Sequence, residues 1–189
     1  MYTGKHVILA SQSPRRKQLL EQAGIPFEVK VVDTAETFPA GMHIPEIPVH
    51  IARQKSAAVA ALCSAGDVII TADTVVVLDD TIIGKPKDRD DAIRILSALS
   101  GRTHRVITGV VIQHNGQEQS FSKETEVHFK TLSQEQIIYY IDEYKPYDKA
   151  GAYAIQEWIG AVGIESINGC FYNVMGLPIS NVVEVLQKI

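Results

Sequence analysis

The chain is poor in cysteine and has no long apolar run. Only two of its 189 residues are cysteines, Cys63 and Cys170. They lack the spacing of metal ligands and are too few for a disulfide framework, so we predict two free, buried thiols. The early apolar run at residues 7–10 is too short for a signal peptide, and no run approaches transmembrane length. These absences predict a soluble, cytoplasmic protein.

The chain also lacks an excess of positive charge. It has 18 basic and 22 acidic residues, which give a formal net charge of −4. Bulk attraction to nucleic acid or to an acidic membrane is therefore not expected, and any anion site must come from local clusters of bases. The length suits one domain over residues 1–189, and the 46% of hydrophobic residues suffices for a core.

The central stretch, residues 68–86, combines apolar runs with an acid and a lysine. Asp73 follows the run at residues 68–70, so we predict that it lies at the end of a buried strand. The next run turns through two aspartates into a short strand, which predicts a hairpin, and Lys85 follows it. Sites in α/β sheets form at strand ends, where the acid could hold a metal or polarise water and the lysine could neutralise phosphate. The alternative is that Asp73 caps a turn and Lys85 is a surface charge.

A second cluster follows the first apolar run. Ser13 is a good N-cap and Pro14 a good first helical residue, so we predict a helix that begins here. Arg15, Arg16 and Lys17 then crowd into its first turns, although the helix dipole favours bases at the other end. Together with the hydroxyl-rich turn at Ser11, this pattern predicts a phosphate site. The alternative is a capped surface helix with solvated bases.

The segment of residues 33–48 is rich in proline, glycine and acids, which predicts a long loop. Glu36 within it could be a second carboxylate facing Asp73, or an exposed loop acid. His43 and His50 show no metal-ligand pattern and are expected at the surface. A helix should span residues 49–64, from which Lys55 points either toward the site or into solvent.

The second half of the chain carries clear turn signals. Asn115 and Gly116 predict a type I′ hairpin, and the capping box at Ser133 predicts a helix start. The segment 144–156 combines a charged turn with small residues that suggest backbone close to a ligand, and it ends on the amide of Gln156. We predict irregular structure over residues 160–169.

These pieces together resemble one family, the Maf proteins, which are nucleoside triphosphate pyrophosphatases. The resemblance covers nearly the whole chain, and the motifs in this order are specific. The motifs are LASQSPRR at residues 9–16, ARQK at 52–55, TADTVV at 71–76, GKP at 84–86, SGRTH at 100–104, DKAGAY at 148–153 and NVMGLP at 173–178.

The resemblance implies an α/β fold, a mixed twisted sheet flanked by helices, related to the inosine triphosphate pyrophosphatases. It implies hydrolysis of a nucleoside triphosphate to the monophosphate and pyrophosphate with Mg²⁺ or Mn²⁺, in a house-cleaning role. It gives Asp73 the role of general base, with Glu36 and Asp73 holding the metal. The phosphate-contacting residues that it implies are Ser11, Arg15, Arg16, Lys55 and Lys85, of which the two lysines are catalytic, and Lys149 has a supporting role.

The resemblance also implies a substrate branch. Arg15, Thr74 and Gln156 match the branch that acts on dTTP and UTP, and an amide can donate to O4 and accept from N3–H of thymine or uracil. Three features depart from the family pattern, and one of them is that Glu157 and Trp158 are bulkier than the residues common there. Ala35 stands where many members have an acid, and Ala154 stands where glycine is usual.

Two other functions stay open at this point. One is a nucleotide-binding regulator of cell division with little turnover, since the family has been linked to septum formation. The other is hydrolysis of non-standard purine triphosphates. A homodimer is expected from the resemblance, and no nucleic acid or membrane partner is expected.

Overall fold

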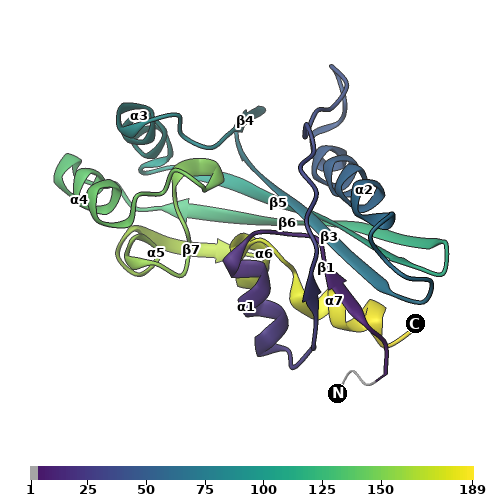
Figure 1. Cartoon of the computed structure of the whole chain (residues 1–189). Helices are drawn as coiled ribbons and strands as arrows, with labels where there is room; N and C mark the ends of the chain where they lie inside the picture. The colour runs from purple at the N-terminus through teal and green to yellow at the C-terminus, as the bar shows by residue number, and fades with distance from the viewer. Residues whose placement is uncertain (1–3) are drawn as a thin grey trace. The chain divides into compact units, whose positions relative to one another are not determined.

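The computed structural model describes residues 4–189 (Figure 1). The described residues divide into two compact units. The first unit takes the described residues up to Asp73 together with Thr108–Lys123 and Gly176–Ile189. The second takes Thr74–Ile107 and Glu124–Met175. Three long strands contribute residues to both units: β3 (Val68–Leu78), β5 (Thr103–His114) and β6 (Gln117–Phe129). The expectation of a single domain stays a prediction.

The fold is mixed α/β, as predicted. The strand order is β2-β1-β3-β5-β6-β7, and β4 pairs with β3 off this path. In the first unit, β1 (Val7–Leu9) pairs in parallel with β3 and with β2 (Glu28–Val29). All three residues of β1 are buried, as the apolar run predicts. The apolar residues within 27–32 also predict a strand, but only the two exposed residues of β2 pair, which is common for a short edge strand.

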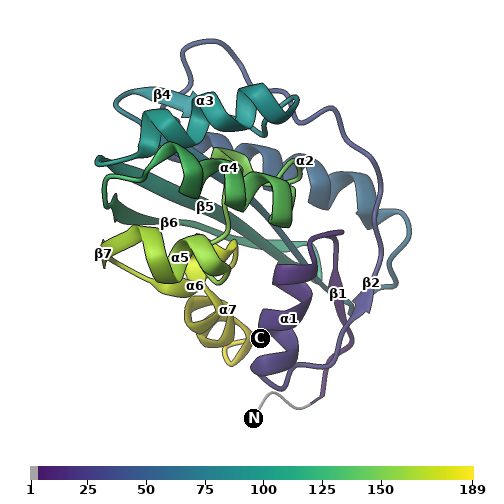
Figure 2. The same cartoon turned by 90° about the vertical axis from the view of Figure 1, so that its left-hand side faces the viewer.

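Helices lie on both sides of the strands of the first unit. Both views place α2 (Ile47–Ala60) on one side, and α1 (Pro14–Gln22) and α7 (Ile179–Leu186) on the other (Figures 1 and 2). A Cβ at Gly109 of β5 would overlap the backbone nitrogen of Val49, so glycine allows α2 to lie directly on the strand.

The long loop ends earlier than predicted. A 3₁₀ turn, η1 (Ile44–Glu46), precedes α2, which begins at Ile47. Pro45 and Pro48 lie in the first turns of these helices, where the missing N–H has no intrahelical partner to lose. A helix start at residue 49 was therefore wrong by two residues, because both prolines were assigned to the loop.

The second unit contains the rest of β3, β5 and β6, with β4 (Thr81–Ile83) and β7 (Ile164–Asn168). β4 returns antiparallel to β3 with Val76 opposite Ile83, which confirms the predicted hairpin. In the first unit, the β5–β6 turn has φ of 50° at Asn115 and 76° at Gly116, which confirms the type I′ signal.

Helix α3 (Arg89–Leu99) packs against α4 (Gln134–Tyr144) in the second unit (Figure 2). The capping box at Ser133 is confirmed: the Gln136 backbone N–H donates to Ser133 Oγ, and the Ser133 backbone N–H donates to Gln136 Oε1. The unit also contains η2 (Ala150–Ala152), α5 (Trp158–Gly163) and α6 (Phe171–Met175). Residues 160–169 were wrongly predicted to be irregular, because they form the end of α5 and β7. Two glycines lower the intrinsic helix propensity of α5, so the sequence does not indicate this short helix. Tertiary packing stabilises it in the fold.

Two further expectations concern single residues. Cys63 and Cys170 are free as predicted, although each is only partly buried. Asp73 does not lie at a strand end, because β3 runs without a break from Val68 to Leu78. The small residues around it fit a strand, and the buried hydroxyl of Thr71 donates to the carbonyl of Ala52 at 2.8 Å.

No helix within residues 4–189 has both the length and the apolar character needed to cross a bilayer.

Candidate functional site

The first unit brings together an acid from β3, a lysine from α2 and an acid from the long loop. Lys55 Nζ lies 2.7 Å from Asp73 Oδ1 and 2.8 Å from Glu36 Oε1. The side chains of Lys55 and Asp73 are 16% and 14% exposed, whereas that of Glu36 is 45% exposed. Lys55 therefore points toward Asp73 and not into solvent. Glu36 is paired with the same lysine as Asp73 and is not an isolated loop acid.

Helix α2 holds the loop at two consecutive residues. Lys55 contacts Glu36, and Gln54 Nε2 donates to the carbonyl of Thr37 at 2.8 Å. Glu36 has a φ of 48°, a left-handed conformation that costs energy for a residue with a side chain. Such a conformation persists where the surroundings hold it, and it occurs often at functional sites.

Arg16 of α1 is almost fully buried beside this cluster. Its guanidinium donates to the carbonyls of Ala72 and Gly176, each at 2.8 Å, and to Ser11 Oγ at 3.2 Å. Burial lowers the pKa of Arg16 from its ordinary value, and the negative charge of Asp73 opposes this effect. Arg16 thus ties α1 to the strand next to Asp73, while its contact with phosphate stays a prediction.

The helix itself begins at Pro14, as predicted. Ser13 stands at the N-cap position, but its side chain makes no capping hydrogen bond. Its backbone N–H instead donates to Ser11 Oγ at 3.2 Å. Ser13 is therefore the N-cap residue, as predicted, but it occupies this position without a side-chain capping bond. Arg15, in the first turn, is half-buried.

Four predicted site residues belong to the second unit. Thr74 follows Asp73 in β3 and is half-buried, and Lys85 is exposed after β4. Lys149 is buried and lies 2.8 Å from Asp148 Oδ1. Gln156 is exposed in a turn. Substrate contact by these residues stays a prediction.

The small-residue segment near Lys149 packs closely against protein. A Cβ at Gly151 would lie 3.0 Å from the side chain of Val76, and the Gly151 N–H donates to the carbonyl of Gly84 at 3.1 Å. Glycine here allows close packing on β3, with a φ of 73°. The small residues predicted that the backbone here lies close to a ligand. In the structure, the backbone at Gly151 lies close to strand β3.

Asp73 and Glu36 suit a hard divalent cation. Mg²⁺ is commonly held by one or two carboxylates, with substrate phosphates and water supplying the other oxygen ligands. Within residues 4–189, no group of three or more His, Cys, Asp or Glu side chains is arranged to hold a metal. Asp73 and Glu36 could supply two oxygen ligands to such a cation, and the metal itself stays a prediction.

The model of the Maf-like protein family matches residues 6–189. The chain belongs to the Maf family. A "dTTP/UTP pyrophosphatase" of Porphyromonas gingivalis is 51% identical over 176 residues, which cover 92% of this chain and 88% of the relative. Proteins of the same name from Phocaeicola vulgatus and Bacteroides thetaiotaomicron are 50% and 46% identical, each over 97% of this chain and 95% of the relative.

A solved structure supports the Maf-like fold. The HAM1 protein of Coxiella burnetii matches 98% of this chain and 100% of its own, with a TM-score of 0.51 and 13% sequence identity. At that identity the likeness concerns the fold alone. It agrees with the mixed α/β architecture predicted for a Maf protein.

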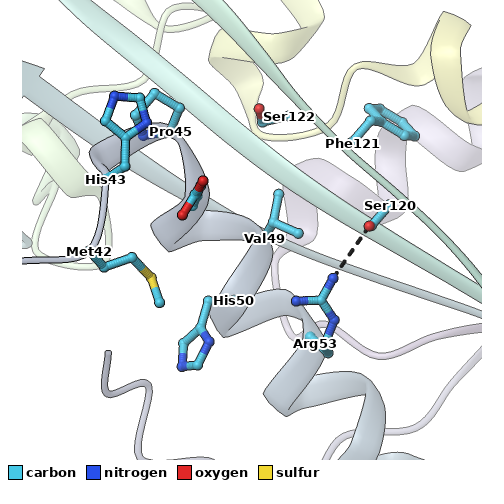
Figure 3. Close-up of a pocket in the computed structure, with 10 residues that line it drawn as sticks. Met42, His43, Pro45, Val49, His50, Arg53, Ser120, Phe121 and Ser122 are labelled. Atoms are coloured by element: carbon cyan, nitrogen blue, oxygen red, sulfur yellow. Dashed lines mark hydrogen bonds between the residues drawn. The ribbon is translucent and has the colours of Figure 1, made fainter. Parts of the chain in front are cut away.

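A separate pocket of about 520 Å³ lies in the first unit of this Maf protein (Figure 3). It includes Arg53, whose guanidinium is bound to Glu118 at 2.7 Å and to Ser120 at 3.4 Å. Residues two apart on a helix do not share a face, so Arg53 points away from the side on which Lys55 meets Asp73. The lining residues are Met42, His43, Pro45, Glu46, Val49, His50, Arg53, Ser120, Phe121 and Ser122.

Sequence reasoning missed two contributors to the site. Gln54 holds the Glu36 loop, and its place beside Lys55 in a family motif was the available signal. Gly176 supplies a carbonyl to Arg16, and no local pattern indicates such a long-range backbone contact. Of the two histidines expected at the surface, His43 is exposed and His50 is half-buried beside Gln54.

Proposed function

We propose that this Maf protein hydrolyses dTTP and UTP to the monophosphate and pyrophosphate. Three relatives that are 46–51% identical over most of their length carry the name of that activity. The observation that carries the proposal is the partly buried ion pair between Lys55 and Asp73, with Glu36 on the same ammonium. Such a cluster can act on a triphosphate, because it combines a carboxylate for water with a cation for phosphate charge.

In the proposed reaction, water attacks the α-phosphorus and pyrophosphate leaves. Asp73 orients the water and accepts its proton, as a general base must do within hydrogen-bond reach. Lys55, Arg15 and Lys85 offset the charge that develops on the phosphate oxygens, which is the main catalytic task in phosphoryl transfer. A divalent cation held by Asp73 and Glu36 would supply further stabilisation of this charge.

Choice of the base is proposed to rest on Gln156. Thymine and uracil present an acceptor at O4 and a donor at N3–H, which one amide can satisfy at the same time. Thr74 and Arg15 match the same branch. A homodimer is proposed on the family resemblance alone, and a cytoplasmic place of action on the lack of an apolar run long enough for a signal peptide or a membrane span.

The deciding experiment measures pyrophosphate release from a panel of nucleotides with Mg²⁺ or Mn²⁺. The panel contains dTTP, UTP, CTP, GTP, ITP, 7-methyl-GTP and 5-methyl-UTP. We expect dTTP and UTP to be the best substrates. Preference for ITP or 7-methyl-GTP would keep the reaction and reject the proposed role of Gln156. Binding without turnover of any nucleotide would reject the enzyme and favour the regulator of cell division.

Asp73→Asn tests the proposed base. We expect kcat to fall by about 10²–10⁴-fold, the usual range for loss of general-base catalysis. Asp80→Asn is the matched control, because the side chain of Asp80 is 98% exposed and its ion pair with Arg105 is long, at 3.6 Å. Full activity in Asp73→Asn would reject the mechanism.

A further inference from the structure

Gln156 is held at the tip of a tight turn in the second unit. The backbone N–H of Glu157 donates to the carbonyl of Ala154 at 3.1 Å, which closes a four-residue β-turn over residues 154–157. We call these residues the Gln156 turn. Gln156 is exposed at its third position, while Ala154 is buried at its start.

One hydroxyl binds both ends of the Gln156 turn. Tyr140 lies on α4 and is fully buried. Its hydroxyl accepts a hydrogen bond from the backbone N–H of Ala154 at 3.1 Å and donates one to Glu157 Oε2. The other oxygen of Glu157 lies 3.6 Å from Lys149 Nζ. The two residues that flank Ile155 and Gln156 are therefore fixed to the same atom of α4.

Two further contacts restrain the turn. Trp158, which follows it, packs edge-on against Tyr139 of α4, with ring centroids 4.9 Å apart. A Cβ at Gly160 would overlap the carbonyl oxygen of Ile155, so α5 lies directly against the turn. The Gly160 N–H donates to the carbonyl of Glu157 at 2.9 Å. Gln156 is thus an exposed side chain on a backbone that is held on several sides.

This rigidity matters for the chemistry that a base-reading amide must perform. Uracil and thymine present an acceptor at position 4 and a donor at position 3, whereas cytosine presents a donor and an acceptor at these positions. An amide turned by 180° has its donor and acceptor exchanged, so it would suit cytosine. An amide discriminates between the two bases only if its position and orientation are set before the base arrives.

We propose that Tyr140 is a positioning residue for pyrimidine selection, acting through the Gln156 turn. The proposal rests on the proposed function, in which Gln156 contacts the base. Loss of the Tyr140 hydroxyl leaves the Ala154 N–H and the Glu157 carboxylate without their shared partner. The turn then samples other positions, and the amide loses part of its preference for O4 and N3–H over the cytosine pattern.

The test is the ratio of kcat/KM for dTTP to kcat/KM for dCTP, measured for Tyr140→Phe. We expect this ratio to fall about three- to tenfold, the range that corresponds to loss of one hydrogen bond. The ratio does not depend on the fraction of active enzyme, so a loss of stability alone leaves it unchanged. Tyr144→Phe is the matched control, since its ring stacks on Tyr140 at 5.0 Å and it is partly exposed. We expect that control to keep the wild-type ratio.

Glu157→Ala is the second variant, and it keeps the Tyr140 ring. It removes the acceptor of the same hydroxyl, so the ratio should fall in the same direction. An unchanged ratio in both Tyr140→Phe and Glu157→Ala would overturn the role of Tyr140.

Gln156→Ala separates this result from failure of the proposed function. If its ratio falls while that of Tyr140→Phe does not, Gln156 reads the base and the role of Tyr140 is rejected. If Gln156→Ala keeps the wild-type ratio, the base-reading role of Gln156 itself is rejected, and the role of Tyr140 with it.

Discussion

Acid should destabilise the second unit through His104. The side chain is 1% exposed, and its Nε2 lies 2.6 Å from the Tyr153 hydroxyl. The rings of Phe129 and Tyr153 pack around it with centroids 5.3 Å and 5.4 Å away. Its Nδ1 is buried with no hydrogen-bond partner among residues 4–189. Burial therefore lowers the pKa of His104 from 6.5 to about 4.

The sign of the effect follows from proton binding. Between pH 6.5 and about 4 the unfolded chain protonates this histidine and the folded chain does not. Stability therefore falls as the pH decreases through that window. At pH 4.5 the predicted loss from this one group is about 2 to 3 kcal/mol, since a tenfold difference in proton affinity is worth about 1.4 kcal/mol. At pH 7 the loss is negligible, because both states hold the neutral ring.

The assay is urea unfolding of the wild type and of His104→Gln at pH 7 and pH 4.5. Glutamine can still bond to Tyr153 and does not titrate. Hydrogen bonds also lower the pKa values of four carboxyl groups, so the protein loses further stability in acid when these groups are protonated. They are Asp67, Asp91, Asp142 and Glu118. Both proteins contain these carboxyl groups, so their contribution cancels when the acid-induced loss of unfolding free energy in His104→Gln is subtracted from that in the wild type. An equal loss of stability in the two proteins between these pH values would refute the reasoning.

Two smaller predictions concern other contacts. Gln54→Ala removes the bond to the Thr37 carbonyl, so the Glu36 loop should loosen and kcat/KM for dTTP should fall about three- to tenfold, as expected for one hydrogen bond. Steady-state kinetics measure this change, and unaltered kinetics would show that Lys55 alone holds the loop. Ser133→Ala removes half of the capping box and should cost about 1 kcal/mol of unfolding free energy in urea, with activity unchanged. A cost near zero would mean that water replaces the cap.

Local signals in the sequence predicted much of the fold. The capping box at Ser133, the hairpin at Asn115 and the helix start at Pro14 all lie where short patterns place them, because each depends on neighbouring residues. The break expected after Asp73 does not exist. Strand β3 passes through polar residues because its neighbours satisfy them, as the Ala52 carbonyl does for Thr71. Such compensation depends on tertiary structure and leaves no local mark.

In the candidate site, too, local patterns were predictable from the sequence and tertiary contacts were not. Lys55 was open to two interpretations, since a lysine on a helix looks the same in sequence whether it is solvated or paired. The structure places it between Asp73 and Glu36, which lie in different elements. The sequence did not indicate that the Tyr140 hydroxyl binds the Gln156 turn. Tyrosine in an amphipathic helix is ordinary core material, and its two partners come from a turn 14 and 17 residues further along the chain.

Arg16 shows how a correct electrostatic argument can have an unexpected answer. Bases in the first turn of a helix oppose its dipole, so the pattern predicted an anionic partner, namely a bound phosphate. In the structure the Arg16 guanidinium donates hydrogen bonds to the Ser11 hydroxyl and to two backbone carbonyls, while its contact with phosphate stays a prediction. The carbonyls belong to Ala72, 56 residues away, and to Gly176, 160 residues away. A buried guanidinium needs several acceptors, and carbonyl groups can provide them without an added anion. Basic residues at a helix start therefore predict an acceptor, and only the fold decides whether that acceptor is a ligand or the protein's own backbone.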